Sequence, residues 1–367
     1  MSVSSTANMT NIDQQQATLR KLYGGGGEFS SARLAGLDIV RCVAIGTVVG
    51  GHFFMNTAFM QENFGGVSMF LQAMVRQVMC VGVPLFIMLT GYLNANKRLS
   101  PGYYRGFIRV LAAYVVYSVM TIAFREYYLD EHRSLWQWTQ AILSFDAIPY
   151  AWYIEMWIGL FALTPFLNVL YKGLTEKRHK QVLIITLVAL SLVAQFLNRY
   201  ELELWPEYWD NVSPLAYFFL GSYIREYKPQ IKVRWAVLLI LSIAVLNPLF
   251  NVVFVHGRPM LQPFGGTDTP LCLVVAICVF LLLYQLDVRS IFTKRMLAKV
   301  SLLSLDMYLV SYMFDATYYP LFMQRFFVSQ SQFGLWWFLL VPLILLSAFA
   351  LSAVVNPLLP TGKTVRK

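Results

Sequence analysis

Charged residues are scarce in this 367-residue chain, and their scarcity excludes a soluble globular protein. Asp, Glu, Lys and Arg make up 13% of the sequence, about half of the roughly 25% that is usual in soluble domains. Nineteen acidic and 29 basic side chains are too few to cover a globule of this length. Hydrophobic residues instead account for 57% of the chain.

Cysteine and alternating apolar patterns are scarce as well. Four cysteines are too few for a secreted disulfide scaffold, and we expect all four to be small core residues. The apolar stretches are continuous, whereas a membrane β-barrel needs alternating segments of about ten residues. An aromatic content of 16% excludes a disordered chain. The class that remains is a polytopic α-helical membrane protein.

Apolar runs of about 20 residues, the length of a membrane-spanning helix, predict about ten spans. The first run carries Asp38 and Arg41, which a cleaved signal peptide would not. We expect residues 1–33 to be a flexible cytoplasmic tail, 34–358 the membrane domain and 359–367 a short cytoplasmic tail. The predicted spans are 35–56, 72–93, 104–124, 150–171, 181–198, 211–226, 235–256, 269–287, 299–321 and 334–358.

The basic residues alternate from loop to loop, and this indicates topology. Most of the Lys and Arg residues lie in the two tails and in every second loop, as in 172–180 and 225–234. This distribution predicts that both termini are cytoplasmic, and it argues against nucleic acid as the partner of a chain with net charge +10. The opposite loops are acidic and contain Glu126, Asp130, Glu131, Asp146, Glu201, Glu203, Glu207 and Asp210.

Ionisable residues inside the spans are costly, so they usually face a water-filled cavity or other protein groups and indicate function. The predicted topology divides them by depth. Near the cytoplasmic side it places Asp38, Arg41, Arg105, Arg109 and Asp306; in the outer half it places His52, Arg76, Glu155 and Asp315.

Arg41 and His52 are eleven residues apart in the first span. At 3.6 residues per turn both side chains point in the same direction, and a rise of 1.5 Å per residue separates them by roughly 16 Å along the helix. One helix face therefore carries a cation near the cytoplasmic side of the membrane and an imidazole in its outer half. A simpler role stays open for each residue. The role of His52 could be limited to a hydrogen bond to a neighbouring helix. Arg41 could anchor the helix at the cytoplasmic surface of the membrane, paired with Asp38.

Several segments together resemble the integral-membrane acyltransferase 3 family, whose hallmark is a basic residue followed after ten residues by histidine. The resemblance covers about residues 34–358, but Ser311 stands where the last motif commonly has histidine, so no second catalytic histidine is carried over. The matching segments, in order, are Gly36-Leu-Asp-Ile-Val-Arg41 with His52, Val83-Pro-Leu-Phe-Ile-Met-Leu-Thr-Gly91, Tyr104-Arg-Gly-Phe-Ile-Arg109, Ala151-Trp-Tyr-Ile-Glu155 and Ser304-Leu-Asp-Met-Tyr-Leu-Val-Ser311.

The resemblance implies transfer of an acyl group, commonly acetyl from cytoplasmic acetyl-CoA, to a hydroxyl of an extracytoplasmic cell-surface polysaccharide or glycolipid. It implies a multi-pass protein of the bacterial plasma membrane. Some family members carry an additional extracytoplasmic hydrolase-like domain. We expect none in this chain, which would act alone or with a separate extracytoplasmic transferase.

The chemistry of the in-span residues fits such a reaction. Arg41, Arg105 and Arg109 would bind the polyanionic acyl-CoA. His52 would act as general base or carry the acyl group transiently, and either Glu155 or Asp315 would orient its ring. For the acceptor we expect contacts with Trp152, Tyr153 and Arg76, although the two aromatic residues could equally be interfacial anchors. No metal ligand set is expected.

Two other classes compete with the predicted all-α membrane acyltransferase. A multi-span transporter could use His52, Glu155 and Asp315 for proton or substrate coupling, but no internal repeat or pair of broken helices supports it. A non-catalytic membrane scaffold would leave the many in-span charges unexplained. Acyl-CoA dependence separates the first class from both alternatives.

Overall fold

The computed structural model describes residues 35–198, 205–206, 208–255 and 257–359, and this part of the chain contains helices and no strands. The tails at 1–33 and 360–367 lie outside the described residues, as do Glu201, Glu203 and Glu207 of one predicted outer loop. The helices are α2 (Ala35–Met55), η1 (Ala58–Met60), α3 (Gly66–Met79), α4 (Gly82–Asn94), α5 (Pro101–Tyr127), α6 (Leu135–Leu143), α7 (Trp152–Gly173), α8 (Lys177–Val188), η2 (Ala189–Val193), α9 (Ala194–Leu197), η4 (Asp210–Val212), α10 (Ser213–Tyr227), α11 (Val233–Ala244), α12 (Leu246–Phe254), α13 (Pro270–Leu283), α14 (Ile291–Phe326), α15 (Gln330–Phe333), η5 (Gly334–Trp336), α16 (Trp337–Val355) and η6 (Asn356–Leu358).

Within the described residues, eight helical segments are long and apolar enough to cross a membrane, so the protein is a multi-pass membrane protein. They coincide with eight of the ten predicted spans. The remaining two predictions coincide with α10 and α13, which are helical but have 15 and 14 residues. The all-helical prediction is confirmed, whereas the number of crossings and the side of each terminus stay predictions.

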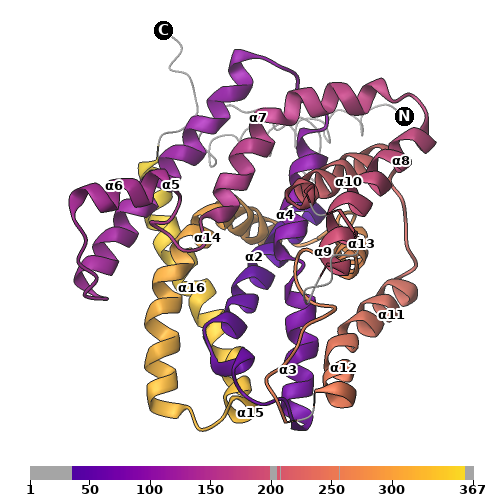
Figure 1. Ribbon diagram of the computed structural model, residues 1–367. Coiled ribbons are helices and arrows are strands. Elements are labelled where there is room, and N and C mark those ends of the chain that lie inside the picture. The colour runs from indigo at the N-terminus through magenta and orange to yellow at the C-terminus, as the bar shows by residue number, and fades with distance from the viewer. Residues whose placement is uncertain (1–34, 199–204, 207, 256, 360–367) are drawn as a thin grey trace, which may run out of the picture. The chain divides into compact units, whose positions relative to one another are not determined.

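Helix α2 lies inside the bundle and packs against α4, α14, α16, α3 and α13 (Figure 1). Its contact with α4 depends on Gly82, where an added Cβ would lie 2.6 Å from Cγ2 of Val48 and 2.9 Å from its backbone nitrogen. This close approach brings the start of α4 against the middle of α2. The helix that carries Arg41 and His52 is therefore surrounded by α3, α4, α13, α14 and α16.

The connection between α5 and α7 is fixed by Arg125, in the last turn of α5. Its guanidinium makes two hydrogen bonds to Glu131, of 2.7 and 2.8 Å, and two of 3.1 Å to the carbonyl oxygens of Asp146 and Ala147. The hydrogen bond from Arg125 and its positive charge hold the pKa of the Glu131 carboxyl below its usual range. This anchoring positions the segment that leads to Tyr150, immediately before α7.

Candidate active site

A buried histidine–aspartate pair joins α2 to α14. Nδ1 of His52 lies 2.9 Å from Oδ2 of Asp315. Asp315 is fully buried, and His52 is 7% exposed. Because the carboxylate engages Nδ1, it selects the ring tautomer and leaves Nε2 as the nitrogen that can exchange a proton with a substrate.

Tyr150 and Asn56 complete this pair. The Tyr150 hydroxyl donates to the same Asp315 oxygen at 3.0 Å, and its ring centroid lies 3.9 Å from that of His52. The Asn56 amide donates to the Tyr150 hydroxyl at 3.0 Å and to the His52 carbonyl oxygen at 2.8 Å. The position of the imidazole is thus set from one side by hydrogen bonding and from another by ring contact.

His52 opens onto a cavity of about 270 Å³, which we call the His52 cavity. Two of the predicted acceptor-binding residues, Arg76 and Trp152, line it together with Tyr150. Arg76 also donates a hydrogen bond to the side chain of Gln262. Cation, indole and imidazole therefore face one space, as recognition of a polar substrate requires.

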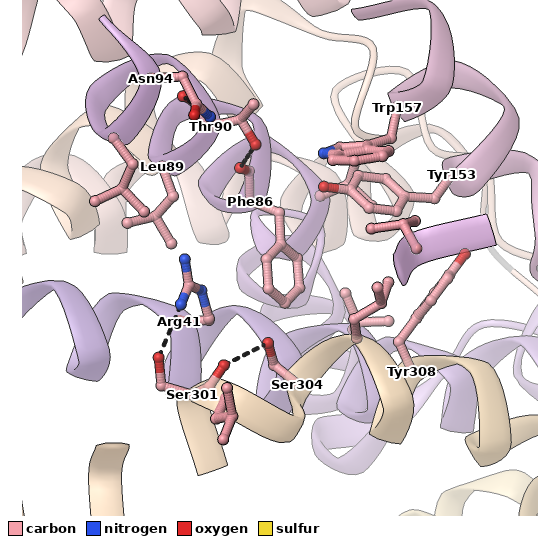
Figure 2. A pocket seen from close by; sticks show the side chains of 16 residues that line it. Arg41, Phe86, Leu89, Thr90, Asn94, Tyr153, Trp157, Ser301, Ser304 and Tyr308 are labelled. Carbon is pink, nitrogen blue, oxygen red and sulfur yellow. Dashed lines mark hydrogen bonds between the residues drawn. The ribbon is translucent and has the colours of Figure 1, made fainter. Parts of the chain in front are cut away.

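A second cavity, also of about 270 Å³, contains Arg41, and we call it the Arg41 cavity. The Arg41 guanidinium donates to the Ser301 hydroxyl at 3.0 Å. Figure 2 shows Arg41 pointing into the space between Ser301 on α14 and Leu89 on α4, with Tyr153 and Trp157 of α7 on another wall. A cation thus sits in a site that has mostly apolar walls, where its interaction with an anion is stronger than at a water-exposed surface.

The two cavities adjoin, because Val48, Val83 and Tyr308 line both of them. The Tyr308 hydroxyl donates to the backbone carbonyl of Tyr150. Along α2 the pair of cavities extends from Arg41 to His52, which is roughly 16 Å at the rise of an α-helix. The helix face predicted from the spacing of these two residues therefore borders both of the adjoining cavities.

A family model described as an acyltransferase domain matches residues 34–356, nearly the whole chain. The chain belongs to this acyltransferase family. Comparison with curated proteins and with solved structures found no match. The matched region contains both cavities and the His52–Asp315 pair of the acyltransferase.

Three of the predicted site residues of the acyltransferase line neither cavity, and a fourth lines a different cavity from the one predicted. Arg105 and Arg109, near the start of α5, are not among the residues that line either cavity, and Arg105 is exposed. Glu155 is exposed on α7 and does not line either cavity. Tyr153, predicted to contact the acceptor, lines the Arg41 cavity instead of the His52 cavity. The structure thus brings Asp315, and not Glu155, to the imidazole.

Other polar residues noted in the sequence have structural partners. Ser311, which replaces the histidine of the family motif, is buried and donates to the Tyr308 carbonyl oxygen at 2.9 Å. Asp306 accepts from the Asn356 amide at 2.5 Å. The four cysteines are not joined in disulfides. Within the described ranges, no group of three or more His, Cys, Asp or Glu residues could hold a metal ion.

Tyr150 and Asn56 could not be identified from the sequence, because uncharged side chains do not stand out in an apolar chain. Tyr150 directly precedes the Ala151-Trp-Tyr-Ile-Glu155 motif, and Asn56 lies one turn after His52. The sequence indicates a role for these two residues only through their position beside a residue of a recognised motif.

Proposed function

We propose that this membrane acyltransferase transfers acetyl from cytoplasmic acetyl-CoA to a hydroxyl of an extracytoplasmic cell-surface glycan at the bacterial plasma membrane. The observation that carries the proposal is the pair of adjoining cavities, with Arg41 in one and the His52–Asp315 pair in the other. A single small ligand would occupy only one of the two cavities. An extended thioester, anionic at one end and reactive at the other, would use its whole length.

The donor would lie with its pantetheine arm in the Arg41 cavity. Arg41 would bind a phosphate or a polar group of the arm through charge-assisted hydrogen bonds. Arg105 and Arg109 belong to the predicted cytoplasmic end of α5, where they would attract the phosphates of the nucleotide without entering the cavity. Tyr153 and Trp157 would pack against the arm.

His52 would act as general base on the acceptor. Nε2 would take the proton of the glycan hydroxyl while the hydroxyl oxygen attacks the thioester carbonyl carbon. The new carbon–oxygen bond forms, the carbon–sulfur bond breaks, and the departing thiolate takes the proton back from His52. Asp315 would stabilise the imidazolium in between. Transient acylation of Nε2, followed by transfer to the hydroxyl, would use the same geometry.

The acceptor would occupy the His52 cavity. Trp152 is half exposed there and could stack on a sugar ring, as amphipathic aromatic side chains do. Arg76 would hydrogen-bond to sugar hydroxyls beside it. A separate extracytoplasmic transferase could receive the acyl group before the final glycan, and the membrane lipids would surround the exposed apolar helix faces.

Removal of Arg41 is expected to weaken donor binding. Arg41→Ala should lower the affinity for acetyl-CoA by roughly 1.5–3 kcal/mol, the range for a lost hydrogen bond to a charged group. Calorimetry on purified protein would measure this. Arg178→Ala, which removes an exposed arginine of α8, is the matched control and should bind acetyl-CoA like the wild type.

The variants Arg105→Ala and Arg109→Ala should lose less affinity than Arg41→Ala, because neither residue lines the cavity. Unchanged acetyl-CoA affinity in all three variants would place the donor site elsewhere in the protein.

Sealed membrane vesicles of known orientation test the whole proposal. Radiolabelled acetyl-CoA added on the cytoplasmic face should label endogenous glycan on the opposite face, and acetyl-CoA added on the outer face should not. Cysteines introduced at 94–103 and 125–149, probed with an impermeant thiol reagent, would establish which face is which. Membranes that lack the protein are the control.

Two results would contradict the proposal in different ways. If labelling requires acetyl-CoA on the face that carries the acidic loops, the proposed orientation is wrong, although the protein is still an acyltransferase. Solute movement that needs no acyl-CoA, without glycan labelling, would favour a transporter that uses His52 and Asp315 for proton coupling.

A further inference from the structure

A further cavity, of about 500 Å³, lies where the ends of α4, α7 and α10 meet the start of α8, and we call it the basic cavity. Figure 1 shows α7 and α8 meeting at the end of the bundle opposite α15. The charged residues of the basic cavity belong to 172–180 and 225–234, two segments that the sequence predicts to be cytoplasmic. None of its lining residues lines the Arg41 cavity or the His52 cavity.

The basic cavity carries a surplus of positive charge. Three cations and one carboxylate line it: Lys172, Lys180, Arg225 and Glu226. Lys180 is 5% exposed, and its Nζ lies 2.7 and 2.9 Å from the two carboxylate oxygens of Glu226. The charges of this pair cancel. The wall therefore keeps two positive charges, on Lys172 and Arg225, that no carboxylate of the cavity balances.

The partners of these two cations are uncharged oxygen atoms. Nζ of Lys172 lies 3.1 Å from Oδ1 of Asn96. Nη1 of Arg225 donates to the carbonyl oxygens of Tyr92 and Leu93, at 2.7 and 3.2 Å. The hydrogen bonds that Arg225 makes within the described residues all come from Nη1, whereas a guanidinium has five N–H donors. Both side chains are thus held in position and retain donors for an anion.

The surface of α7 beside the basic cavity is apolar and exposed. Val169 is 73% exposed and lies three residues before Lys172, so the two side chains share one face of the helix. Phe166, one turn earlier, is 54% exposed. Such side chains on a membrane-spanning helix contact lipid hydrocarbon. A lipid whose phosphate reached Lys172 would therefore have its acyl chains beside Val169, a contact that a water-soluble anion does not make.

We propose that the basic cavity binds the phosphate headgroup of an anionic phospholipid from the membrane leaflet at this end of the bundle. Basic cavities between membrane helices bind such headgroups at the cytoplasmic surface. Lys172 and Arg225 donate charge-assisted hydrogen bonds to the phosphate oxygens, while Lys180 stays paired with Glu226. The site takes no part in acyl transfer, so its test needs neither donor nor acceptor.

Native mass spectrometry of the full-length protein in a neutral detergent tests the site, with dioleoyl phosphatidylglycerol as the probe. Dioleoyl phosphatidylcholine has the same chains and a phosphate but no net charge, and it should bind at least fivefold more weakly. Lys172→Gln and Arg225→Gln should each lower the affinity for phosphatidylglycerol about fivefold, the loss expected for one cation near a membrane surface. Lys172→Arg keeps the charge and should bind like the wild type.

Lys97→Gln is the matched control, because Lys97 is an exposed lysine of a predicted cytoplasmic loop and does not line the basic cavity. It should bind phosphatidylglycerol like the wild type. An equal loss in Lys97→Gln would overturn the proposal, since diffuse surface charge would then attract the lipid. Arg225 also bonds to the end of α4, so Lys172→Gln decides the result if Arg225→Gln does not fold.

Two further results would overturn the proposal. One is equal affinity of the wild type for phosphatidylglycerol and phosphatidylcholine, or wild-type affinity in Lys172→Gln. The other comes from glycerol 3-phosphate, which carries the phosphate without acyl chains and should not displace phosphatidylglycerol at equal concentration. If it does, the ligand of the basic cavity is a water-soluble phosphate and the assignment to a lipid is wrong.

Discussion

Replacement of His52 by alanine is expected to abolish acyl transfer without preventing folding. His52 lines the cavity where the reaction would take place, and a positioned general base contributes about 10²–10⁴-fold to rate. In the variant the buried Asp315, which loses its hydrogen bond to His52, still accepts a hydrogen bond from the Tyr150 hydroxyl. Glycan labelling should fall by that factor in His52→Ala vesicles.

Two measurements make this result specific to chemistry. The His52→Ala protein should insert, purify as a monodisperse species and bind acetyl-CoA with wild-type affinity, because Arg41 lies in the other cavity. His132→Ala is the matched control, since His132 is a solvent-exposed histidine paired with Glu126 at 3.0 Å. It should label glycan like the wild type. Comparable turnover by His52→Ala would refute the catalytic assignment.

The pattern of apolar runs was sufficient to predict the helices, because a membrane span must be long, continuous and internally hydrogen-bonded. The first predicted span, 35–56, differs from α2 by one residue. The second, 72–93, conceals a break: α3 ends at Met79 and α4 begins at Gly82. Hydropathy does not detect this break, since residues 78–83, which contain it, include no charged or strongly polar side chain.

The relation of Arg41 to His52 was predictable because both lie on one helix, whose geometry fixes their spacing and direction. The partner of His52 was not. Asp315 is 263 residues away, and choosing it over Glu155 requires the rotation of α14 and α7 about their axes. In helices that are apolar on nearly every side, the sequence pattern does not define that rotation.

The cavities themselves depend on packing between helices and could not be predicted either. The Arg41 cavity takes residues from α2, α4, α5, α7 and α14. Val48, Val83 and Tyr308 line both cavities only because α2, α4 and α14 meet there. Such a site becomes visible only once side chains from distant segments are placed together.

The second large effect is expected when Asp315 is replaced. It distinguishes Asp315 from Glu155 as the carboxylate that orients His52, a choice that the sequence left open. Asp315→Asn keeps the shape of the side chain but removes the charge that fixes the His52 tautomer and stabilises the imidazolium. Glycan labelling should fall by about 10²-fold or more, with acetyl-CoA affinity unchanged. Glu155→Gln, on an exposed position of α7, is the matched control and should retain wild-type labelling.

A double-mutant cycle tells whether Asp315 acts through His52 or only supports the fold. If the carboxylate works by orienting the imidazole, its removal matters only while the imidazole is present, so His52→Ala/Asp315→Asn should be no slower than His52→Ala alone. A purely structural role would instead lower the amount of monodisperse protein in both backgrounds. Losses that multiply, or a Glu155→Gln variant as slow as Asp315→Asn, would show that the pair seen between α2 and α14 does not operate as a unit.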